Sequence, residues 1–257
     1  VTASQSMLLV SLGTEGSLLA GAMCVIPFLQ PRHFPPLRSF YDEWLAFALG
    51  LAAVALAAAG RREVRVRIPA LALSLAAFAL FLPLRAFVAH PAYVQSSLNW
   101  ALYVLFAAWL VALGHALATQ FGRERVCDAL AAFLLFGALA NAGVAVLQVT
   151  GIPQPIDAFV AYLRGTRAVG NVAQANLFAN YLALGEASLL YLFARGRLAG
   201  PAALAGALLL LASAALADSR SSLLYAACFA LLGWLLLRRT REAPMRRLGN
   251  AAIVLAI

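Results

Sequence analysis

Long apolar runs fill most of the chain, and polar residues interrupt them at short intervals. A membrane-spanning helix needs about 20 mostly apolar residues. Eight runs reach or approach this length, and a ninth begins near residue 248 and stops at Ile257. The eight runs cover residues 7–29, 44–60, 68–89, 98–119, 127–149, 172–194, 198–217 and 222–237. We therefore predict an all-α, polytopic integral membrane protein with eight complete transmembrane helices plus a truncated ninth.

The composition agrees with this class. Hydrophobic residues make up 64% of the 257 residues and charged residues only 11%, whereas a soluble domain is about one quarter charged. The net charge is +9, and all 19 basic residues are arginine. So basic a chain can suggest a nucleic-acid partner. The arginines lie in short loops between apolar runs, however, which is typical of topology signals, so we expect no nucleic acid and a lipid bilayer instead.

The arginines also predict the orientation of the helices. Thirteen of the 19 fall in the loops that follow the second, fourth, sixth and eighth runs. Because positive loops stay in the cytoplasm, these loops and the N-terminus are predicted to be cytoplasmic. The loops 30–43, 90–97, 150–171 and 218–221 then face outward, which in a bacterium means the periplasm.

The stretch "TRAVGNVAQANLFANYLALG" (166–185) is unusually polar for a membrane segment. It carries Arg167, Asn171, Gln174, Asn176 and Asn180, and such groups are costly against lipid. At about 100° per helical residue, the first two amides share one face and the last two share another. This helix end is therefore predicted to face protein or water.

Glu186 follows deeper in the same predicted span. A carboxyl group inside the membrane indicates a functional site. A buried hydrogen bond to a neighbouring helix is the alternative, and both remain open. Asn141 and Gln148 are seven residues apart on the fifth span, hence on one face, and could be its partners.

The stretch "LADSRSSLLY" (216–225) lies at the predicted outer junction of the seventh and eighth spans. Its serines could cap the eighth helix. Backbone N–H groups at a helix start, together with Arg220 and Ser219, would form an anion site, and arginine suits bidentate phosphate contact. A simple turn with an interfacial arginine is the alternative.

Other chemistry is weakly indicated. Cys24, Cys127 and Cys228 are isolated, and no acidic pair resembles a divalent-metal site, so we predict neither metal nor cofactor. Asp42 and Glu43 suit the start of a helix. The three histidines are scattered, and we expect them to be structural: His33, His90 and His115.

Three stretches occur in an order that resembles a known family: "PRHFPPLRSFYDEWLA" (31–46), "RAVGNVAQANLFANYLALG" (167–185) and "DSRSSLL" (218–224). The chain resembles bacterial protein O-oligosaccharyltransferases, the pilin-glycosylation ligases of the O-antigen ligase and polymerase superfamily. In the second stretch the family pattern G-N-x-x-Q-x-N-x-x-A is carried by Gly170, Asn171, Gln174, Asn176 and Ala179. The resemblance divides a single membrane domain, 1–257, into N-terminal helices (1–165) and the start of a ligase-like region (166–257).

The resemblance implies a multi-pass protein of the bacterial inner membrane with a periplasmic active face. It implies metal-independent transfer of a glycan from an undecaprenyl-pyrophosphate carrier to a Ser or Thr of an acceptor protein such as pilin. By position Arg220 matches a pyrophosphate-binding arginine, and Arg167 is a weaker match. Asn171, Gln174, Asn176, Ser219 and Glu186 complete the predicted substrate-binding set.

Two departures qualify the resemblance. The family's large outer loop, with a histidine as the base, would lie beyond Ile257, so no catalytic residue is predicted in this chain. We expect an N-terminal fragment that is inactive alone. The family also usually has histidine where Leu177 stands.

Three other functions remain open. An O-antigen ligase or polymerase would act on lipopolysaccharide rather than on protein. A transporter or flippase of a lipid-linked solute would move its substrate without covalent transfer. A membrane scaffold would need the polar residues only for folding.

Overall fold

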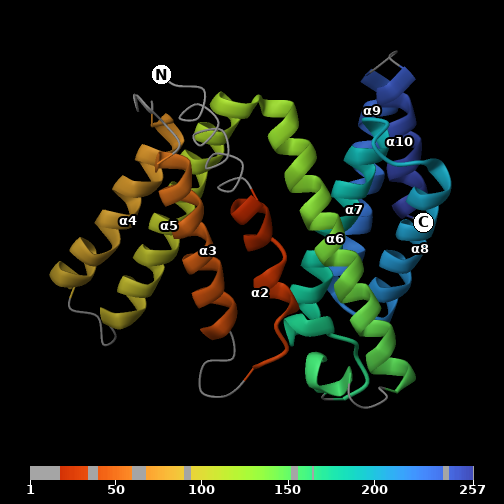
Figure 1. Ribbon diagram of the computed structural model, residues 1–257, viewed down its shortest axis with the longest axis horizontal. Helices are drawn as coiled ribbons and strands as arrows, with labels where there is room; N and C mark the ends of the chain where they lie inside the picture. Colours follow the sequence, from red (N-terminus) through yellow and green to blue (C-terminus); the bar gives the residue numbers. More distant parts are fainter. Residues whose placement is uncertain are drawn as a thin grey trace, which may run out of the picture. The chain divides into compact units, whose positions relative to one another are not determined.

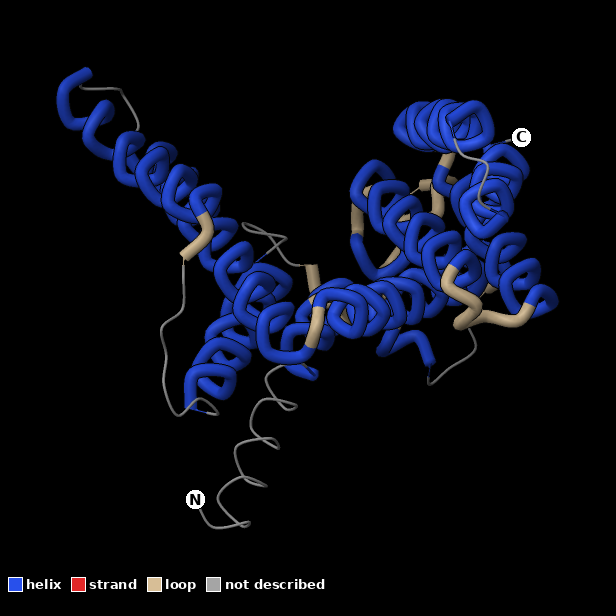
Figure 2. The backbone as a smooth tube through the Cα atoms, turned by 90° about the horizontal axis from the view of Figure 1, so that it is seen from above, coloured by secondary structure: helices blue, strands red, loops and turns tan. Residues whose placement is uncertain are grey.

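The computed structural model describes residues 18–33, 40–59, 68–89, 94–151, 156–163, 165–239 and 243–256. Throughout these ranges the chain is helical apart from short loops and turns (Figures 1 and 2). The chain divides into two compact units, one of residues 1–20 and 47–127 and the other of residues 21–46 and 128–257. The candidate site belongs entirely to the second unit.

The first unit is built from α3 (Phe40–Ala59), of which residues 47–59 belong to it, α4 (Ala70–Ala89) and α5 (Val94–Phe121). Helices α4 and α5 pack against each other along their lengths. Phe87 on α4 remains 78% exposed. Because a large apolar side chain is unfavourable in water, we infer that this face of α4 contacts lipid.

The second unit surrounds one central helix. It contains α2 (Ile26–Leu29), α6 (Arg123–Thr150, from Asp128 onward), α7 (Ala175–Ala194), α8 (Gly200–Ala217), α9 (Arg220–Arg239), α10 (Ala243–Ala256) and the short 3₁₀ turns η1 (Ile156–Phe159) and η2 (Gly170–Val172). Helix α7 packs against α8, α9 and α10. Most of α7 is buried, more than of any other candidate span, so it forms the axis of this unit.

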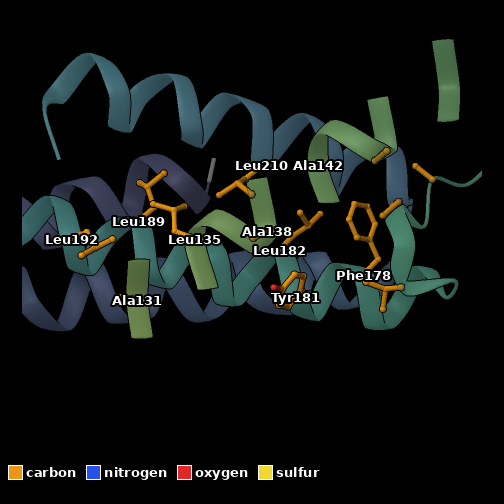
Figure 3. Close-up of a cluster of buried hydrophobic side chains, with 14 of the residues drawn as sticks. Ala131, Leu135, Ala138, Ala142, Phe178, Tyr181, Leu182, Leu189, Leu192 and Leu210 are labelled. Carbon is orange, nitrogen blue, oxygen red and sulfur yellow. The ribbon is translucent and has the colours of Figure 1, made fainter. Parts of the chain in front are cut away.

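Small residues allow the helices around α7 to approach closely (Figure 3). An added Cβ at Gly185 of α7 would collide with the Cβ of Ala138 on α6. Leu182 and Leu210 fill the remaining space and are fully buried. Close contact between small residues is a common way for membrane helices to associate, because lipid supplies no hydrophobic driving force between them.

Among the residues that the structure describes, six helices are long and apolar enough to span a membrane, and they match the predicted runs from 68–89 onward: α4, α5, α6, α7, α8 and α9. The all-helical membrane class is therefore confirmed, but eight spans are not shown. The run 7–29 lies partly outside the described residues, with a short apolar helix at Leu18–Leu29. The run 44–60 corresponds to α3, which is not among the six.

Candidate functional site

The polar stretch does not begin as a helix. Residues 170–172 form the turn η2, and α7 starts only at Ala175. Gly170 and Ala173 have φ angles of 55° and 61°, in the left-handed region that interrupts a right-handed helix. The prediction that Asn171 and Gln174 share a helix face is therefore wrong, because both precede the helix.

Asn171 is the centre of a buried hydrogen-bond network and is 2% exposed. Its Nδ2 donates to the carbonyl oxygens of Leu29 at 2.7 Å and Phe159 at 2.8 Å. Its Oδ1 accepts from the backbone N–H of Ala161 at 2.8 Å. One amide therefore joins the end of α2 to the loop after α6, and its cost in an apolar setting is offset by these bonds.

Asn141 and Gln148 of α6 complete this network. The Oδ1 of Asn141 accepts from the backbone N–H of Asn171 at 2.8 Å. The Oε1 of Gln148 accepts from the backbone N–H of Gly170 at 3.0 Å, and its Nε2 donates to the Gly170 carbonyl at 2.9 Å. The expectation that these two amides are partners of Glu186 is wrong, because the turn before α7 uses them.

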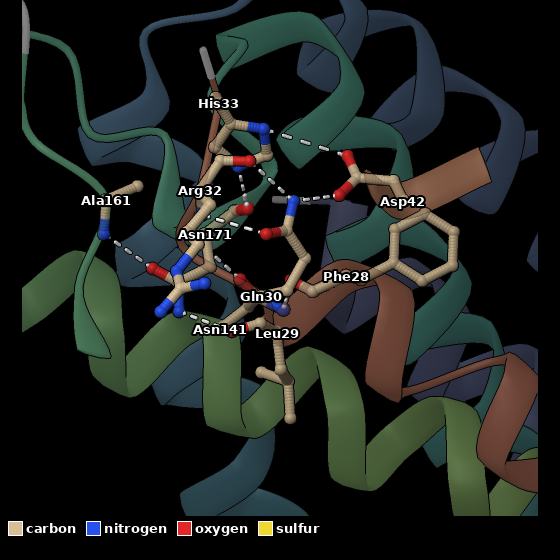
Figure 4. Close-up of polar contacts among 9 residues, drawn as sticks. All are labelled: Phe28, Leu29, Gln30, Arg32, His33, Asp42, Asn141, Ala161 and Asn171. Carbon is tan, nitrogen blue, oxygen red and sulfur yellow. Dashed lines mark hydrogen bonds and ion pairs between the residues drawn. The ribbon is translucent and has the colours of Figure 1, made fainter. Parts of the chain in front are cut away.

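His33 and Asp42 extend the network beyond Asn171 (Figure 4). Nε2 of His33 donates to the carbonyl oxygen of Asn171 at 2.7 Å. Nδ1 of His33 lies 3.8 Å from Oδ2 of Asp42, whose other oxygen accepts from the amide of Gln30. Burial raises the pKa of the Asp42 carboxyl, whereas the Gln30 hydrogen bond and His33 act to lower it. His33 therefore connects the residues that follow α2 to the turn before α7.

A second group of polar contacts joins residues near the starts of α7 and α9. Arg167 pairs with Asp218 at 3.3 Å, and both side chains are largely exposed, at 59% and 76%. Ser219 donates from Oγ to Oδ1 of Asn176 at 2.9 Å and accepts from the backbone N–H of Ser221 at 3.3 Å. This serine therefore caps the first turn of α9, as its position in the sequence predicts.

Arg220 is the first residue of α9 and is exposed. Its guanidinium makes no ion pair or hydrogen bond with any residue that the structure describes, in contrast to that of Arg167. Two positive features coincide here, because the helix start carries a partial positive charge beside the guanidinium. This combination is suited to binding an anion.

The remaining predicted residues lie at different depths. Gln174 is the exposed N-cap of α7 and makes no side-chain capping bond. Glu186 is buried, at 6% exposure, and lies ten residues beyond Asn176, or about 15 Å along the helix. Arg167, Asn171, Gln174, Asn176, Ser219 and Arg220 therefore gather around one end of the bundle, while Glu186 does not.

Sequence reasoning missed the role of His33 and Asp42. The sequence signal was present, because a histidine and a carboxylate stand nine positions apart in a proline-rich loop beside a membrane span. It also missed Tyr225, whose hydroxyl donates to Oδ1 of Asn180 at 2.6 Å. A tyrosine near a helix end is ordinarily read as an interface residue, which concealed this contact.

The fold and the site define a multi-pass helical membrane protein with a polar, arginine-bearing mouth at one end of its helical bundle. A family model described as protein glycosylation ligase matches residues 168–193. These residues include the turn η2 and nearly all of α7. The resemblance to protein glycosylation ligases is thus confirmed at the level of the family, which implies glycosyltransferase activity toward protein. No curated protein and no solved structure matches the chain.

Proposed function

We propose that the polar mouth binds the pyrophosphate of a lipid-linked glycan, as part of an enzyme that transfers the glycan to protein. The donor would be an undecaprenyl-pyrophosphate glycan and the acceptor a Ser or Thr hydroxyl of a periplasmic protein such as pilin. The observation that carries the proposal is Arg220 in the first turn of α9, an exposed guanidinium that has no partner among the residues the structure describes.

The chemistry of transfer explains why such a site is needed. The acceptor oxygen forms a bond to the anomeric carbon, and the bond from that carbon to the pyrophosphate oxygen breaks. The departing pyrophosphate takes the bonding electrons, so negative charge grows on it. A fixed guanidinium and the N–H groups of a helix start stabilise this charge where it develops. The hydroxyl proton passes to a base, and we assign no residue of this chain to that role.

The neighbours of Arg220 contribute to the proposed binding site in different ways. Ser219 and Asn176 fix the start of α9 against the start of α7 through their 2.9 Å hydrogen bond. Arg167 contributes less, because its charge is already paired with Asp218. Asn171 acts indirectly, since its side chain is occupied in holding the turn. Gln174 is exposed beside this group and would contact the sugar or phosphate.

The distribution of arginine within the second unit supports a periplasmic mouth. At the opposite end of the bundle, Arg195 and Arg197 both pair with Asp128, at 3.4 and 2.9 Å. Arg238 and Arg239 end α9 at the same side. Because arginine-rich ends remain cytoplasmic, the mouth with Arg220 is expected to face outward, in a bacterial inner membrane.

The binding step can be tested directly with the purified chain in nanodiscs. We expect undecaprenyl pyrophosphate to bind, and Arg220→Ala to weaken binding at least tenfold. Arg220→Lys should also weaken it, because the bidentate geometry is lost. Arg239→Ala is the matched control, as an exposed arginine at the other end of the same helix, and should bind normally. Equal affinity of wild type and Arg220→Ala would contradict the assignment.

The transfer step is tested with the full-length gene product, a lipid-linked glycan and two acceptors. We expect glycan on the acceptor protein and loss of transfer in Arg220→Ala at unchanged expression. Glycan on lipopolysaccharide instead would indicate an O-antigen ligase. Movement of the lipid-linked glycan across vesicles without covalent transfer would indicate a flippase.

A further inference from the structure

Beneath the mouth, three polar side chains line a small recess that the proposed function does not use. The recess has a volume of about 40 Å³. Its polar lining consists of Glu186 from α7 with Ser222 and Tyr225 from α9, and the rest is apolar. The three residues come from two helices that pack directly against each other.

Two of these polar groups lack a partner among the described residues. The Oγ of Ser222 is buried and has no hydrogen-bond partner there. Glu186 is 6% exposed, and its carboxyl group makes no hydrogen bond or ion pair with the residues that the structure describes. A buried hydroxyl or carboxyl group without a partner is costly. Native proteins usually satisfy such groups with an ordered water.

The recess meets the physical requirements of a water site. One water needs roughly 10–15 Å³ of accessible volume and two to four polar partners, and this recess exceeds that volume. The Tyr225 hydroxyl already donates its proton to Asn180, so its oxygen can accept a hydrogen bond. Glu186, Ser222 and Tyr225 together therefore offer a suitable set of donors and acceptors.

We propose that the recess binds water, and that the bound water connects a protonated Glu186 to Ser222. An ionised carboxylate in a membrane span needs a cation, and none of the recess residues supplies one. The neutral acid donates its O–H to the water, and the water donates to Ser222 Oγ and Tyr225 Oη. The site holds an exchangeable proton between α7 and α9. Its α9 residue Ser222 lies two positions after Arg220 in the sequence. It does not depend on the glycosyl-transfer proposal.

Infrared spectroscopy of the purified protein at neutral pH tests the protonation state. We expect a carboxylic-acid C=O band that shifts in D₂O and that Glu186→Gln removes. The glutamine keeps the size and the hydrogen-bonding capacity of the side chain, so this variant should fold. If Glu186→Gln removes no such band, Glu186 is ionised and the proposal fails.

The hydrogen bonds that link Glu186 to Ser222 through water are tested with the same carboxylic-acid C=O band. Ser222→Ala should move it to higher frequency, because the chain of hydrogen bonds is shortened. Ser188→Ala is the matched control: this buried serine of α7 already donates to the carbonyl of Leu184 at 2.7 Å and lies outside the recess. The band should not move in that variant. An unchanged band in Ser222→Ala would overturn the proposed connection.

The water itself is detected by exchange into H₂¹⁸O. We expect an isotope-sensitive water O–H band that disappears in Ser222→Leu, whose side chain fills the recess. Ala226→Leu, which also lines the recess, serves if the first variant does not fold. Persistence of the band in a folded, filled variant would place the water elsewhere and would refute the site.

Discussion

Asn171 illustrates how one amide can determine the local structure of an apolar chain. Each polar atom of its side chain has a backbone partner, and the partners come from near Leu29, Phe159 and Ala161. Such fully satisfied networks are favourable in a low-dielectric interior and costly when a member is lost. The polar stretch was visible in the sequence, but its partners were not, because they lie up to 142 positions away.

Gly170 supplies a test at the scale of one residue. Its φ angle is 55°, and an added Cβ would lie 2.8 Å from Oδ1 of Asn141 and 2.9 Å from the Phe178 ring. We expect Gly170→Ala to lower the free energy of unfolding by about 2 kcal/mol, from left-handed strain and overpacking. Thermal unfolding in detergent measures the change.

Gly143 provides the control for that substitution. It lies within α6, and an added Cβ there would meet nothing within 4 Å. Gly143→Ala should be neutral or slightly stabilising, because alanine favours helix over glycine. Equal stabilities for Gly170→Ala and wild type would show that the turn before α7 can adopt another conformation.

At the scale of elements, the apolar runs predicted helices well and helix ends poorly. Within the described ranges, six runs became helices that are long and apolar enough to span a membrane, because a membrane segment must satisfy its own backbone hydrogen bonds. Helix α7 nevertheless starts at Ala175 rather than at the predicted residue 172, because Gly170 and Ala173 take left-handed conformations. Hydropathy carries no information about such a turn. The start of α9 was better predicted, since its Asp-Ser-Arg-Ser-Ser sequence is typical of a helix N-terminus.

The contact between α7 and α9 gives a prediction at this scale. Tyr225 donates to Asn180 at 2.6 Å, and Ser219 donates to Asn176 at 2.9 Å. We expect Tyr225→Phe to destabilise the protein by about 0.6 kcal/mol, the usual size of a hydrogen bond between membrane helices. A double-mutant cycle with Asn180→Ala measures this coupling. Tyr162→Phe should have no effect, because Tyr162 is 84% exposed; zero coupling in the cycle would contradict the contact.

At the scale of the whole molecule, loop charge and apolar runs predict a multi-pass membrane protein, which the structure bears out in its class. Loop charge and apolar runs could not, however, identify the residues of the candidate site. Arg167 and Arg220 are 53 positions apart in sequence. They lie at the same end of the bundle because α7 leads away from that end and α8 returns to it. Loop charge alone could not rank them, whereas the structure pairs Arg167 with Asp218 and gives Arg220 no ion pair within the described ranges.

Orientation in the membrane is testable by cysteine labelling in a variant without the three native cysteines. Thr166→Cys, at the mouth, should react with a membrane-impermeant maleimide added to cells whose outer membrane is permeable. Arg239→Cys should react only after the inner membrane is opened, because the arginine-rich end is expected in the cytoplasm. The reverse pattern would place the mouth in the cytoplasm and would exclude a periplasmic donor site.

The contact between His33 and Asn171 has a consequence for biosynthesis. The two residues are 138 positions apart, and a ribosome adds roughly 5–20 residues per second. His33 must therefore wait, for roughly 7–28 seconds, until the turn that receives it has been synthesised. During that interval His33 cannot make its hydrogen bond to the carbonyl oxygen of Asn171. Assembly of this polar mouth is thus a late, post-insertion step, in which an insertase or chaperone would have time to act.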